Sequence, residues 1–173
     1  MTSNALTDSA AAVLAAAEAA GVRIALAESL TGGALSSALV EVPGASKVLL
    51  GSVVAYDSSA KHGILGVSRS LLTMQGAVDP EVAAQMALGA AAKFANALGG
   101  SEADSDAVLG VSTTGVAGPD PQDGKPVGQV YIGLALGGRV EVHELSLKGD
   151  RASIRGQVVA VALERTLAFL ASK

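Results

Sequence analysis

The segment Ile24–Gly33, with the sequence IALAESLTGG, changes within ten residues from a short apolar run to hydroxyl residues and glycines. A bounded run of small apolar residues is typical of a buried strand, and the pattern ALSSALVEV that follows has helical spacing. A strand that leads directly into a helix is the repeating unit of a parallel sheet. Ligands of open α/β sheets bind beyond the carboxyl ends of such strands. The segment therefore predicts an α/β fold and places Ser29 at its ligand-binding edge.

The rest of the chain continues this alternation of strands and helices. Asp79-Pro80-Glu81 is a typical helix start, and Gly137-Gly138 separates two strand-like segments as in a hairpin. The sequence thus predicts a single three-layer α/β/α domain over residues 1–173, with a mixed sheet and helices on both faces. The predicted helices cover 7–20 (capped by Thr7 or Asp8), 32–42, a short segment from 58, 68–74, 80–98 (ended by Gly99-Gly100) and 151–170, and the predicted strands cover 22–27, 47–56, 106–115, 129–136 and 139–147.

The composition of the 173 residues argues against several classes of function. The formal net charge of −4 gives no general attraction to nucleic acid. The absence of cysteine excludes disulfides, thiolate nucleophiles and Fe–S ligands, and the two histidines, His62 and His143, lack the spacing of metal ligands. No apolar run reaches the ~18 residues of a membrane span, and the N-terminus lacks the basic region of a secretory signal. We therefore expect a cytoplasmic protein that binds no metal, membrane or nucleic acid.

The chain carries no motif for a nucleotide cofactor. A P-loop has four residues between its glycines, followed by Lys and a hydroxyl residue. Here five residues separate Gly118 from Gly124, and Pro126 follows Lys125. The pattern G-x-G-x-x-G does not occur either, so the sequence predicts no cofactor.

Ser29 has two possible roles, and the residues alone leave both open. In the first, Ser29 or Thr31 caps the following helix, as hydroxyl residues commonly do. In the second, Ser29 is a nucleophile at the strand end, and Gly32 and Gly33 let a substrate approach the backbone closely. The amides at the start of the helix would then stabilise an oxyanion.

A serine nucleophile needs a base, and Lys61 is the candidate. Lysine acts as a base at neutral pH only if desolvation or a nearby cation lowers its pKa from ~10.4. The alternative is a solvated surface lysine. Ser58 forms an S-x-x-K pattern with Lys61, but the companion K-T-G is absent. Ser29 is therefore the preferred nucleophile.

Arg151 and Arg155 lie four residues apart on one face at the start of the last predicted helix. Two arginines beside a helix N-terminus suit a phosphate or a carboxylate. An ordinary surface ion pair with Asp150 is the simpler interpretation of the same residues. Tyr56 either stacks on a flat ring or fills the core.

Five blocks of sequence occur in a fixed order along the chain. They are AESLTGG, VPGASKVLLGSVVAYDSSAK, GAVDPEVAAQM, TGVAGPDPQDGKPVGQVYIGLA and GDRASIR. Together they resemble the CinA C-terminal domain family, the nicotinamide-nucleotide amidases. The resemblance covers nearly the whole chain, and five blocks in register are specific where no single block is. The length is similar to that of the stand-alone amidases.

The resemblance implies hydrolysis of the carboxamide of nicotinamide mononucleotide to nicotinate mononucleotide and ammonia, in pyridine-nucleotide salvage. It implies a Ser-Lys dyad without a metal, in which Ser29 is the nucleophile and Lys61 the base. It also implies a homodimer or a higher homo-oligomer. On this basis Thr31, Gly32 and Gly33 would supply the oxyanion amides, Arg151 and Arg155 would hold the 5′-phosphate, and Tyr56 and Thr114 would line the ring or ribose pocket.

The chain departs from the family pattern at three places. Leu30 replaces the usual Cys, Gln75 replaces a common His, and Asp57-Ser58 stands where the family usually has Ser-Asn. None of these changes removes the dyad, and the last bears on substrate affinity or specificity. Two other functions stay open at this point. One is a non-catalytic nucleotide-binding protein associated with competence or damage, and the other is an amidase for another small amide.

Overall fold

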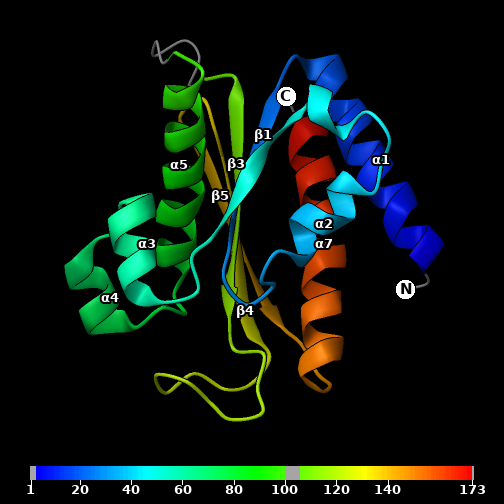
Figure 1. Cartoon of the computed structure of the whole chain (residues 1–173). Coiled ribbons are helices and arrows are strands. Elements are labelled where there is room, and N and C mark those ends of the chain that lie inside the picture. The colour runs from blue at the N-terminus through cyan, green and yellow to red at the C-terminus, as the bar shows by residue number, and fades with distance from the viewer. Residues whose placement is uncertain (1–2, 100–105, 173) are drawn as a thin grey trace.

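The computed structural model describes residues 3–99 and 106–172, which form a five-stranded sheet between two layers of helices (Figure 1). The strand order is β2-β1-β3-β4-β5. The first three strands in this order run parallel, whereas β4 is antiparallel to both β3 and β5. The strands are β1 (Arg23–Glu28), β2 (Leu49–Val54), β3 (Val108–Gly115), β4 (Gln129–Leu136) and β5 (Arg139–Ser146).

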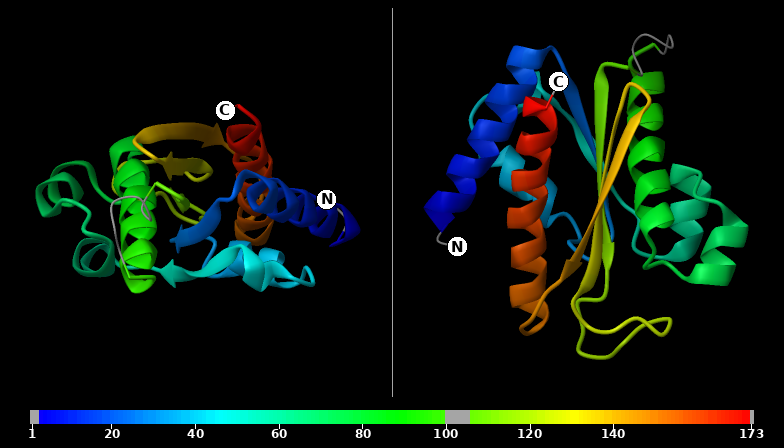
Figure 2. Two further views of the ribbon diagram at one scale, coloured as in Figure 1. Left: turned by 90° about the horizontal axis from the view of Figure 1, so that it is seen from above. Right: turned by 180° about the vertical axis from the view of Figure 1, so that it is seen from behind.

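The helices cover both faces of the sheet (Figure 2). Helix α1 contacts α7 on one face, while α5 packs against β1, β3 and β4 on the other. This arrangement confirms the predicted three-layer fold, the mixed sheet and the late hairpin. One layer contains α1 (Ser3–Ala20), α2 (Ala34–Val40) and α7 (Arg151–Ala171), the other contains α3 (Ser58–Leu65), α4 (Arg69–Gln75) and α5 (Pro80–Ala97), and a 3-10 helix, η1 (Ala45–Lys47), precedes β2.

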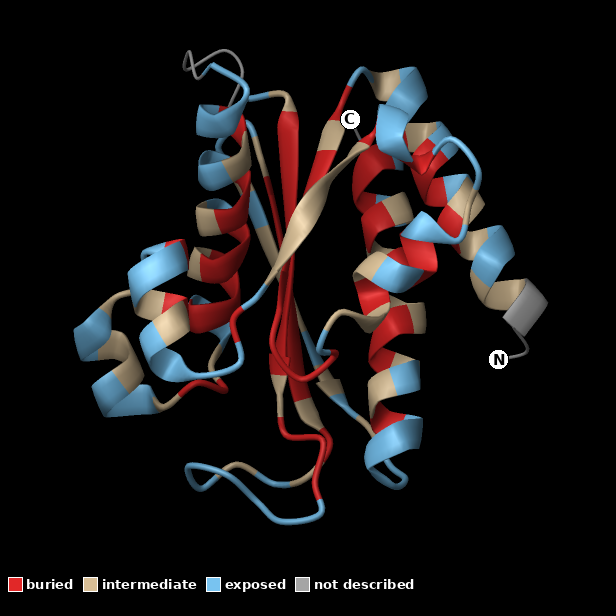
Figure 3. Cartoon of the chain, viewed as in Figure 1, coloured by how far each residue is buried: buried red, intermediate tan, exposed pale blue. Residues whose placement is uncertain are grey.

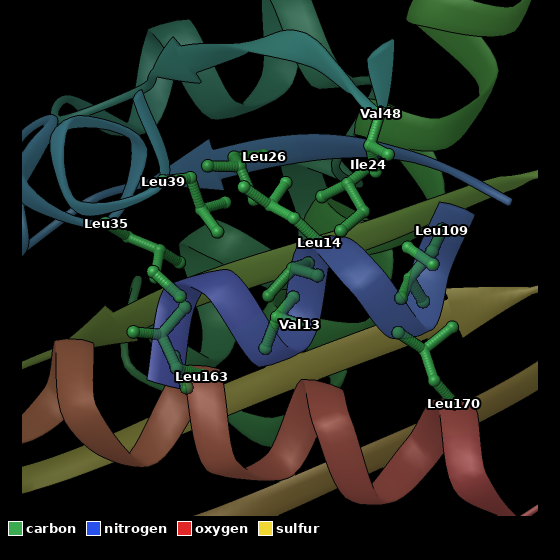
Figure 4. Close-up of a cluster of buried hydrophobic side chains, with 14 of the residues drawn as sticks. Val13, Leu14, Ile24, Leu26, Leu35, Leu39, Val48, Leu109, Leu163 and Leu170 are labelled. Carbon is green, nitrogen blue, oxygen red and sulfur yellow. The ribbon is translucent and has the colours of Figure 1, made fainter. Parts of the chain in front are cut away.

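Strand β1 lies in the middle layer, and its side chains alternate between the two faces. Ile24 and Leu26 belong to the cluster shared with α1, α2 and α7 (Figure 4), whereas Ala25 and Ala27 belong to the cluster beneath α5. Buried residues follow the sheet and the inward faces of the helices (Figure 3). Helix α5 approaches the sheet closely, because a Cβ on Gly110 would lie 1.9 Å from a backbone carbonyl oxygen of that helix.

Several element boundaries differ from the prediction. Helix α1 begins at Ser3, so Thr7 and Asp8 lie inside it and neither is its cap. The sequence ahead of Gly21 contains no glycine or proline, which leaves nothing to delay the helix start. The predicted end of α5 falls partly on Gly100, which lies outside the described residues.

The segments around β2 and α2 are shorter than predicted. Gly32 and Gly33 have φ angles of +59° and +93°, which are left-handed and interrupt a right-handed helix, so α2 begins only at Ala34. The predicted strand 47–56 shortens to β2, because η1 takes up its first residue and the chain leaves the sheet after Val54.

The parallel arrangement determines where the site lies. Strands β1, β2 and β3 point in the same direction, so their carboxyl ends meet at one edge of the sheet. The segments that follow Glu28, Val54 and Gly115 therefore come together there. This edge is where an open α/β sheet binds its ligands.

Candidate active site

Ser29 lies directly beyond the carboxyl end of β1. Its N–H donates to the carbonyl of Thr113 on β3 at 2.9 Å, which extends the parallel pairing by one residue past the strand. Ser29 is only 7% exposed, and it lines a cavity. The serine hydroxyl is thus fixed at the sheet edge where the sequence predicted it.

Lys61 is fully buried, and its side-chain nitrogen contacts Ser29. The Nζ atom lies 2.9 Å from Ser29 Oγ, 2.8 Å from the carbonyl oxygen of Ala55 and 3.0 Å from that of Tyr56. Burial lowers the pKa of Lys61 from 10.5 to about 8, and the nearby charge of Asp57 opposes this shift. Much of Lys61 is therefore neutral at mildly alkaline pH. This desolvated lysine is not a solvated surface residue.

The three contacts of Lys61 Nζ suit both of its protonation states. As an ammonium, Lys61 has three N–H donors and can donate to Ser29 Oγ and to both carbonyls. As a neutral amine, it keeps two N–H donors for the carbonyls of Ala55 and Tyr56. Its lone pair then faces Ser29 and can accept a hydrogen bond from the serine hydroxyl. The two carbonyls thus orient Lys61 as a general base would have to be oriented.

Glu28, the last residue of β1, caps helix α2. Its carboxylate is 0% exposed. It accepts hydrogen bonds from the N–H groups of Gly33 at 3.0 Å, Leu35 at 3.1 Å and Ser36 at 2.9 Å, and from the hydroxyl of Ser52 on β2 at 3.1 Å. These donors include amides that have no partner within the helix, and the negative charge suits the helix N-terminus. Glu28 therefore joins β1, β2 and α2 next to Ser29.

Neither Ser29 nor Thr31 caps helix α2, although the sequence left this role open for both. The N-cap residue of α2 is Gly33, which makes no side-chain capping bond. The Ser29 hydroxyl contacts Lys61 instead, and the Thr31 hydroxyl lies 2.8 Å from that of Thr113. A carboxylate one residue earlier satisfies the helix amides, so both hydroxyls are available for other contacts.

Two of the amides predicted to bind an oxyanion are already engaged. The N–H of Gly32 donates to the carbonyl of Ser29 at 3.1 Å, and the N–H of Gly33 donates to Glu28 at 3.0 Å. Leu30 lines the cavity at Ser29, whereas Thr31, Gly32 and Gly33 do not. The prediction for Gly32 and Gly33 is therefore corrected, because both N–H groups hold the turn together. Of the predicted donors, only the amide of Thr31 lacks such a contact.

A cavity of about 490 Å³, including the part open to solvent, lies over the Ser29–Lys61 pair. Tyr56, Thr114 and Arg151 also line it, so the structure brings these five predicted residues together. The Thr114 hydroxyl donates to a backbone carbonyl at 2.7 Å and keeps its lone pairs as acceptors. Tyr56 is 60% exposed at the cavity, which excludes the alternative of a core residue.

Arg151, at the start of α7, links two segments of the cavity wall. Its Nη1 atom donates to the carbonyl of Gly118 at 2.7 Å, and its Nη2 atom donates to the Tyr56 hydroxyl at 2.9 Å. A guanidinium has five N–H donors, so these two contacts leave others free for an anion. Asp150 caps α7 through its contact with Ser153 and, among the described residues, forms no ion pair with Arg151.

Arg155 makes different contacts from those of Arg151. Its Nε atom donates to the carbonyl of Leu30 at 2.9 Å, and its Nη2 atom donates to that of Thr31 at 2.7 Å. Arg155 does not line the cavity. The predicted pairing of the two arginines on one phosphate therefore needs correction, since Arg155 is bound to the backbone of the turn after Ser29.

Sequence reasoning gave no role to Glu28, Asp120 or Gln122. Asp120 and Gln122 line the cavity from the loop between β3 and β4. The only signal for Glu28 was a charged residue that ends an apolar strand, in a segment otherwise made of small and hydroxyl residues. Within residues 3–99 and 106–172, no group of three or more acidic or histidine side chains could hold a metal ion. In the same part of the chain, no helix is both long and apolar enough to cross a membrane.

The fold and the site define a three-layer α/β protein with a buried serine–lysine pair at the carboxyl end of a parallel strand. The chain belongs to the CinA C-terminal domain family, whose model matches residues 6–170. The family resemblance drawn from the sequence blocks is thereby confirmed.

Individual relatives agree with this membership. The chain is 41% identical over 148 residues to a CinA-like protein of Frankia casuarinae, an alignment that covers 86% of this chain and 32% of that protein. The chain thus spans about a third of the length of the curated relatives it matches.

Solved structures of the family have the same fold. A CinA superfamily protein from Klebsiella pneumoniae is 27% identical, covers 100% of both chains and has a TM-score of 0.84. The competence/damage inducible protein CihA from Agrobacterium tumefaciens is 34% identical, covers 94% of both chains and has a TM-score of 0.83.

Proposed function

We propose that this protein is a serine amidase that hydrolyses the carboxamide of nicotinamide mononucleotide, with Ser29 as nucleophile and Lys61 as base. The observation that carries the proposal is the 2.9 Å contact between Lys61 Nζ and Ser29 Oγ inside a buried site. A buried lysine with a lowered pKa can act as a base, whereas a solvated surface lysine stays charged. The products are nicotinate mononucleotide and ammonia, which places the reaction in pyridine-nucleotide salvage.

The first half of the reaction forms an acyl-enzyme. Neutral Lys61 takes the hydroxyl proton of Ser29 as Oγ attacks the carboxamide carbon, and the carbonyl oxygen becomes an oxyanion. The carbon–nitrogen bond then breaks while the Lys61 ammonium returns its proton to the leaving nitrogen. Ammonia departs, and the nicotinoyl group stays on Ser29 as an ester. The carbonyls of Ala55 and Tyr56 hold Lys61 in place throughout.

The second half of the reaction restores the enzyme. Neutral Lys61 takes a proton from a water molecule, whose oxygen attacks the ester carbon. The bond to Ser29 Oγ breaks, and the serine oxygen takes the proton back from Lys61. Nicotinate mononucleotide is formed as the carboxylic acid, which releases its proton to solvent and leaves as a carboxylate. No step needs a metal ion, because lysine performs both proton transfers.

The sequence resemblance and the cavity wall support the substrate assignment. Nicotinamide mononucleotide carries a phosphate, and Arg151 lines the cavity with guanidinium donors that its two protein contacts leave free. Phosphate is a preferred ligand of this side chain. Tyr56 and Thr114 would line the ring or ribose part of the pocket. Arg155 has no part in this phosphate site, since it does not line the cavity.

The test is ammonia release from nicotinamide mononucleotide, with a metal chelator present throughout. Ser29→Ala and Lys61→Ala should both lose turnover, while Ser58→Ala should keep it and serves as the matched hydroxyl control. Binding of the nucleotide without hydrolysis by the wild type would contradict the proposal and favour a nucleotide-binding protein. Turnover of a different small amide, with none of this nucleotide, would contradict the substrate assignment alone. A homo-oligomeric state stays a prediction for sedimentation analysis.

A further inference from the structure

The turn Ser29–Gly33, which we call the nucleophile turn, is fixed by its side chains and by its carbonyls. Leu30 packs in a buried cluster against α7, and the Thr31 hydroxyl lies 2.8 Å from that of Thr113. The guanidinium of Arg155 reaches from α7 and donates to the carbonyls of both residues at 2.9 and 2.7 Å. The backbone of this turn is therefore held in one orientation.

Two amides of the nucleophile turn have no acceptor among the described residues. The amide of Ser29 donates to β3, that of Gly32 to the turn itself and that of Gly33 to a carboxylate. The remaining amides belong to Leu30 and Thr31, which are 3% and 0% exposed. Backbone N–H groups at buried positions are almost always paired. Two unpaired ones beside a candidate nucleophile indicate that the ligand supplies their acceptor.

The carbonyl contacts determine where these two amides point. In a trans peptide the C=O and N–H groups point in opposite directions, and the cis bond found in the described chain lies elsewhere, at Gly118-Pro119. The carbonyl of Leu30 faces Arg155, so the N–H of Thr31 in the same peptide plane points away from that guanidinium. The carbonyl of Ser29 accepts a bond within the turn, so the N–H of Leu30 points out of it.

We propose that the amides of Leu30 and Thr31 form the oxyanion hole and that Arg155 is the positioning residue that holds the peptide plane of the Thr31 amide. The inference rests on the amidase function proposed above. The amide of the residue after the nucleophile is an oxyanion donor in other serine hydrolases. Donors held in place before the reaction stabilise the developing charge without reorganisation. Arg155 thus acts on the transition state through the backbone, without touching the substrate.

This role predicts effects that differ from those of phosphate binding. An arginine that binds the substrate phosphate affects only substrates that carry a phosphate, mainly through KM. A lysine in place of that arginine keeps the positive charge. The planar fork of Arg155 instead serves two carbonyls, and an ammonium does not reproduce that geometry. Arg151, four residues earlier on α7, provides the matched comparison because it lines the cavity.

The experiment compares two arginines on two substrates. Wild type, Arg155→Gln, Arg155→Lys and Arg151→Gln are assayed on nicotinamide mononucleotide and on nicotinamide riboside, which has the same carboxamide and no phosphate. Both Arg155 variants should lose kcat by about tenfold or more, by the same factor on both substrates, as for a weakened oxyanion hole. Their dissociation constant for nicotinate mononucleotide should stay near that of the wild type. Arg151→Gln should instead raise KM for the nucleotide alone.

Other results of this experiment would contradict either the role of Arg155 or the amidase function. Wild-type kcat in Arg155→Lys, or a loss confined to KM for the nucleotide, would overturn the inference and assign Arg155 to anion binding. No turnover of either substrate by the wild type would contradict the amidase function itself. Product binding and thermal unfolding identify a variant that fails to fold.

A backbone change tests the amide directly and does not depend on the Arg155 variants. Replacing Thr31 by its α-hydroxy analogue converts its amide to an ester, which removes the N–H and keeps the side chain. The loss of one oxyanion donor should lower kcat by about 10²–10³-fold. An unchanged kcat in this protein would overturn the inference.

Discussion

The Nη2 atom of Arg151 donates a 2.9 Å hydrogen bond to the hydroxyl of Tyr56, a residue 95 positions earlier in the chain. The contact joins the start of α7 to the segment that leads from β2 into α3, and both residues line the cavity over Ser29. Arg151 also donates to the carbonyl of Gly118, which connects the loop between β3 and β4 to the same side chain. Arg151 therefore fixes the relative positions of three cavity segments as well as offering donors to a ligand.

Tyr56→Phe removes the hydroxyl that accepts from Arg151 and keeps the ring. A hydrogen bond of this kind contributes ~0.5–1.5 kcal/mol, so KM for nicotinamide mononucleotide should rise by about 2- to 10-fold with a smaller effect on kcat. Initial-rate kinetics measure the change. Nicotinamide riboside is the control substrate, and an equal rise in its KM would show that the contact does not act through a phosphate.

The rate of the proposed reaction should depend on pH through Lys61. The pKa of Lys61 is lowered to about 8 by burial, and only its neutral form accepts the proton of Ser29. The value of kcat/KM for the free enzyme should therefore increase as pH rises through about 8 and level off above it. A rate profile that is flat from about pH 6 to about pH 10 would exclude Lys61 as the base.

Asp57→Asn should move this profile toward lower pH. Asp57 caps α3 through the N–H of Ser59 at 2.8 Å, and asparagine retains a capping oxygen. The charge of Asp57 raises the pKa of Lys61, against the larger lowering by burial, so its removal lets that pKa fall further. The pH at half-maximal kcat/KM is the quantity to compare with the wild type. A shift toward higher pH would contradict this electrostatic account.

The layers and the edge of the sheet could be predicted because local patterns determine them. Apolar runs, helix starts and Gly137-Gly138 are local signals, and the alternation of strands and helices then requires a parallel sheet. That rule also brings Ser29 near the segment after β2, where Lys61 lies. The residue patterns named Ser29 and Lys61 as candidates but left a helix cap and a surface lysine as alternatives, and the sequence resemblance favoured the catalytic roles.

The corrected roles depend on where long side chains and single amides point. Helical spacing placed Arg151 and Arg155 on one face of α7, but it does not determine which groups their guanidiniums reach. Glu28 was missed as a cap because its partners lie five to eight residues ahead, beyond a turn whose shape only the folded chain determines. The glycine amides seemed free in sequence because their acceptors are a neighbouring carbonyl and that same carboxylate.

Glu28→Gln should destabilise the fold strongly. The carboxylate accepts four hydrogen bonds, from three amides of the α2 start and from Ser52. Glutamine has one acceptor oxygen, its NH₂ group would face donors, and hydrogen bonds to charged groups contribute ~1.5–3 kcal/mol each. The free energy of unfolding in urea should fall by about 2–4 kcal/mol. Ser52→Ala, which removes one of the four donors, is the control with a loss of about 1 kcal/mol, and equal stability of wild type and Glu28→Gln would refute the capping role.

Lys61 also makes the stability of the fold depend on pH. Its pKa is about 8 in the folded protein and 10.5 when exposed. Between these pH values the unfolded chain holds a proton that the folded chain has released, so the free energy of unfolding rises with pH across this window. Its contribution is fully present above the unfolded value and is lost as pH falls through the folded value. Over the whole window it amounts to about 3 kcal/mol, since one pKa unit corresponds to ~1.4 kcal/mol.

Lys61→Met isolates this contribution, because other groups titrate alike in both proteins. The absolute stability of the variant also reflects the two carbonyls, of Ala55 and Tyr56, that lose their donor. Subtracting the unfolding free energy of Lys61→Met from that of the wild type at each pH leaves the effect of these carbonyls as a constant offset, so only the change with pH reports on Lys61. Urea unfolding at about pH 7, about pH 9 and about pH 10.5 should show the wild type gaining stability relative to Lys61→Met as pH rises. Parallel curves would mean that Lys61 titrates alike in the folded and unfolded chain, and a neutral base at Ser29 would then have no thermodynamic support.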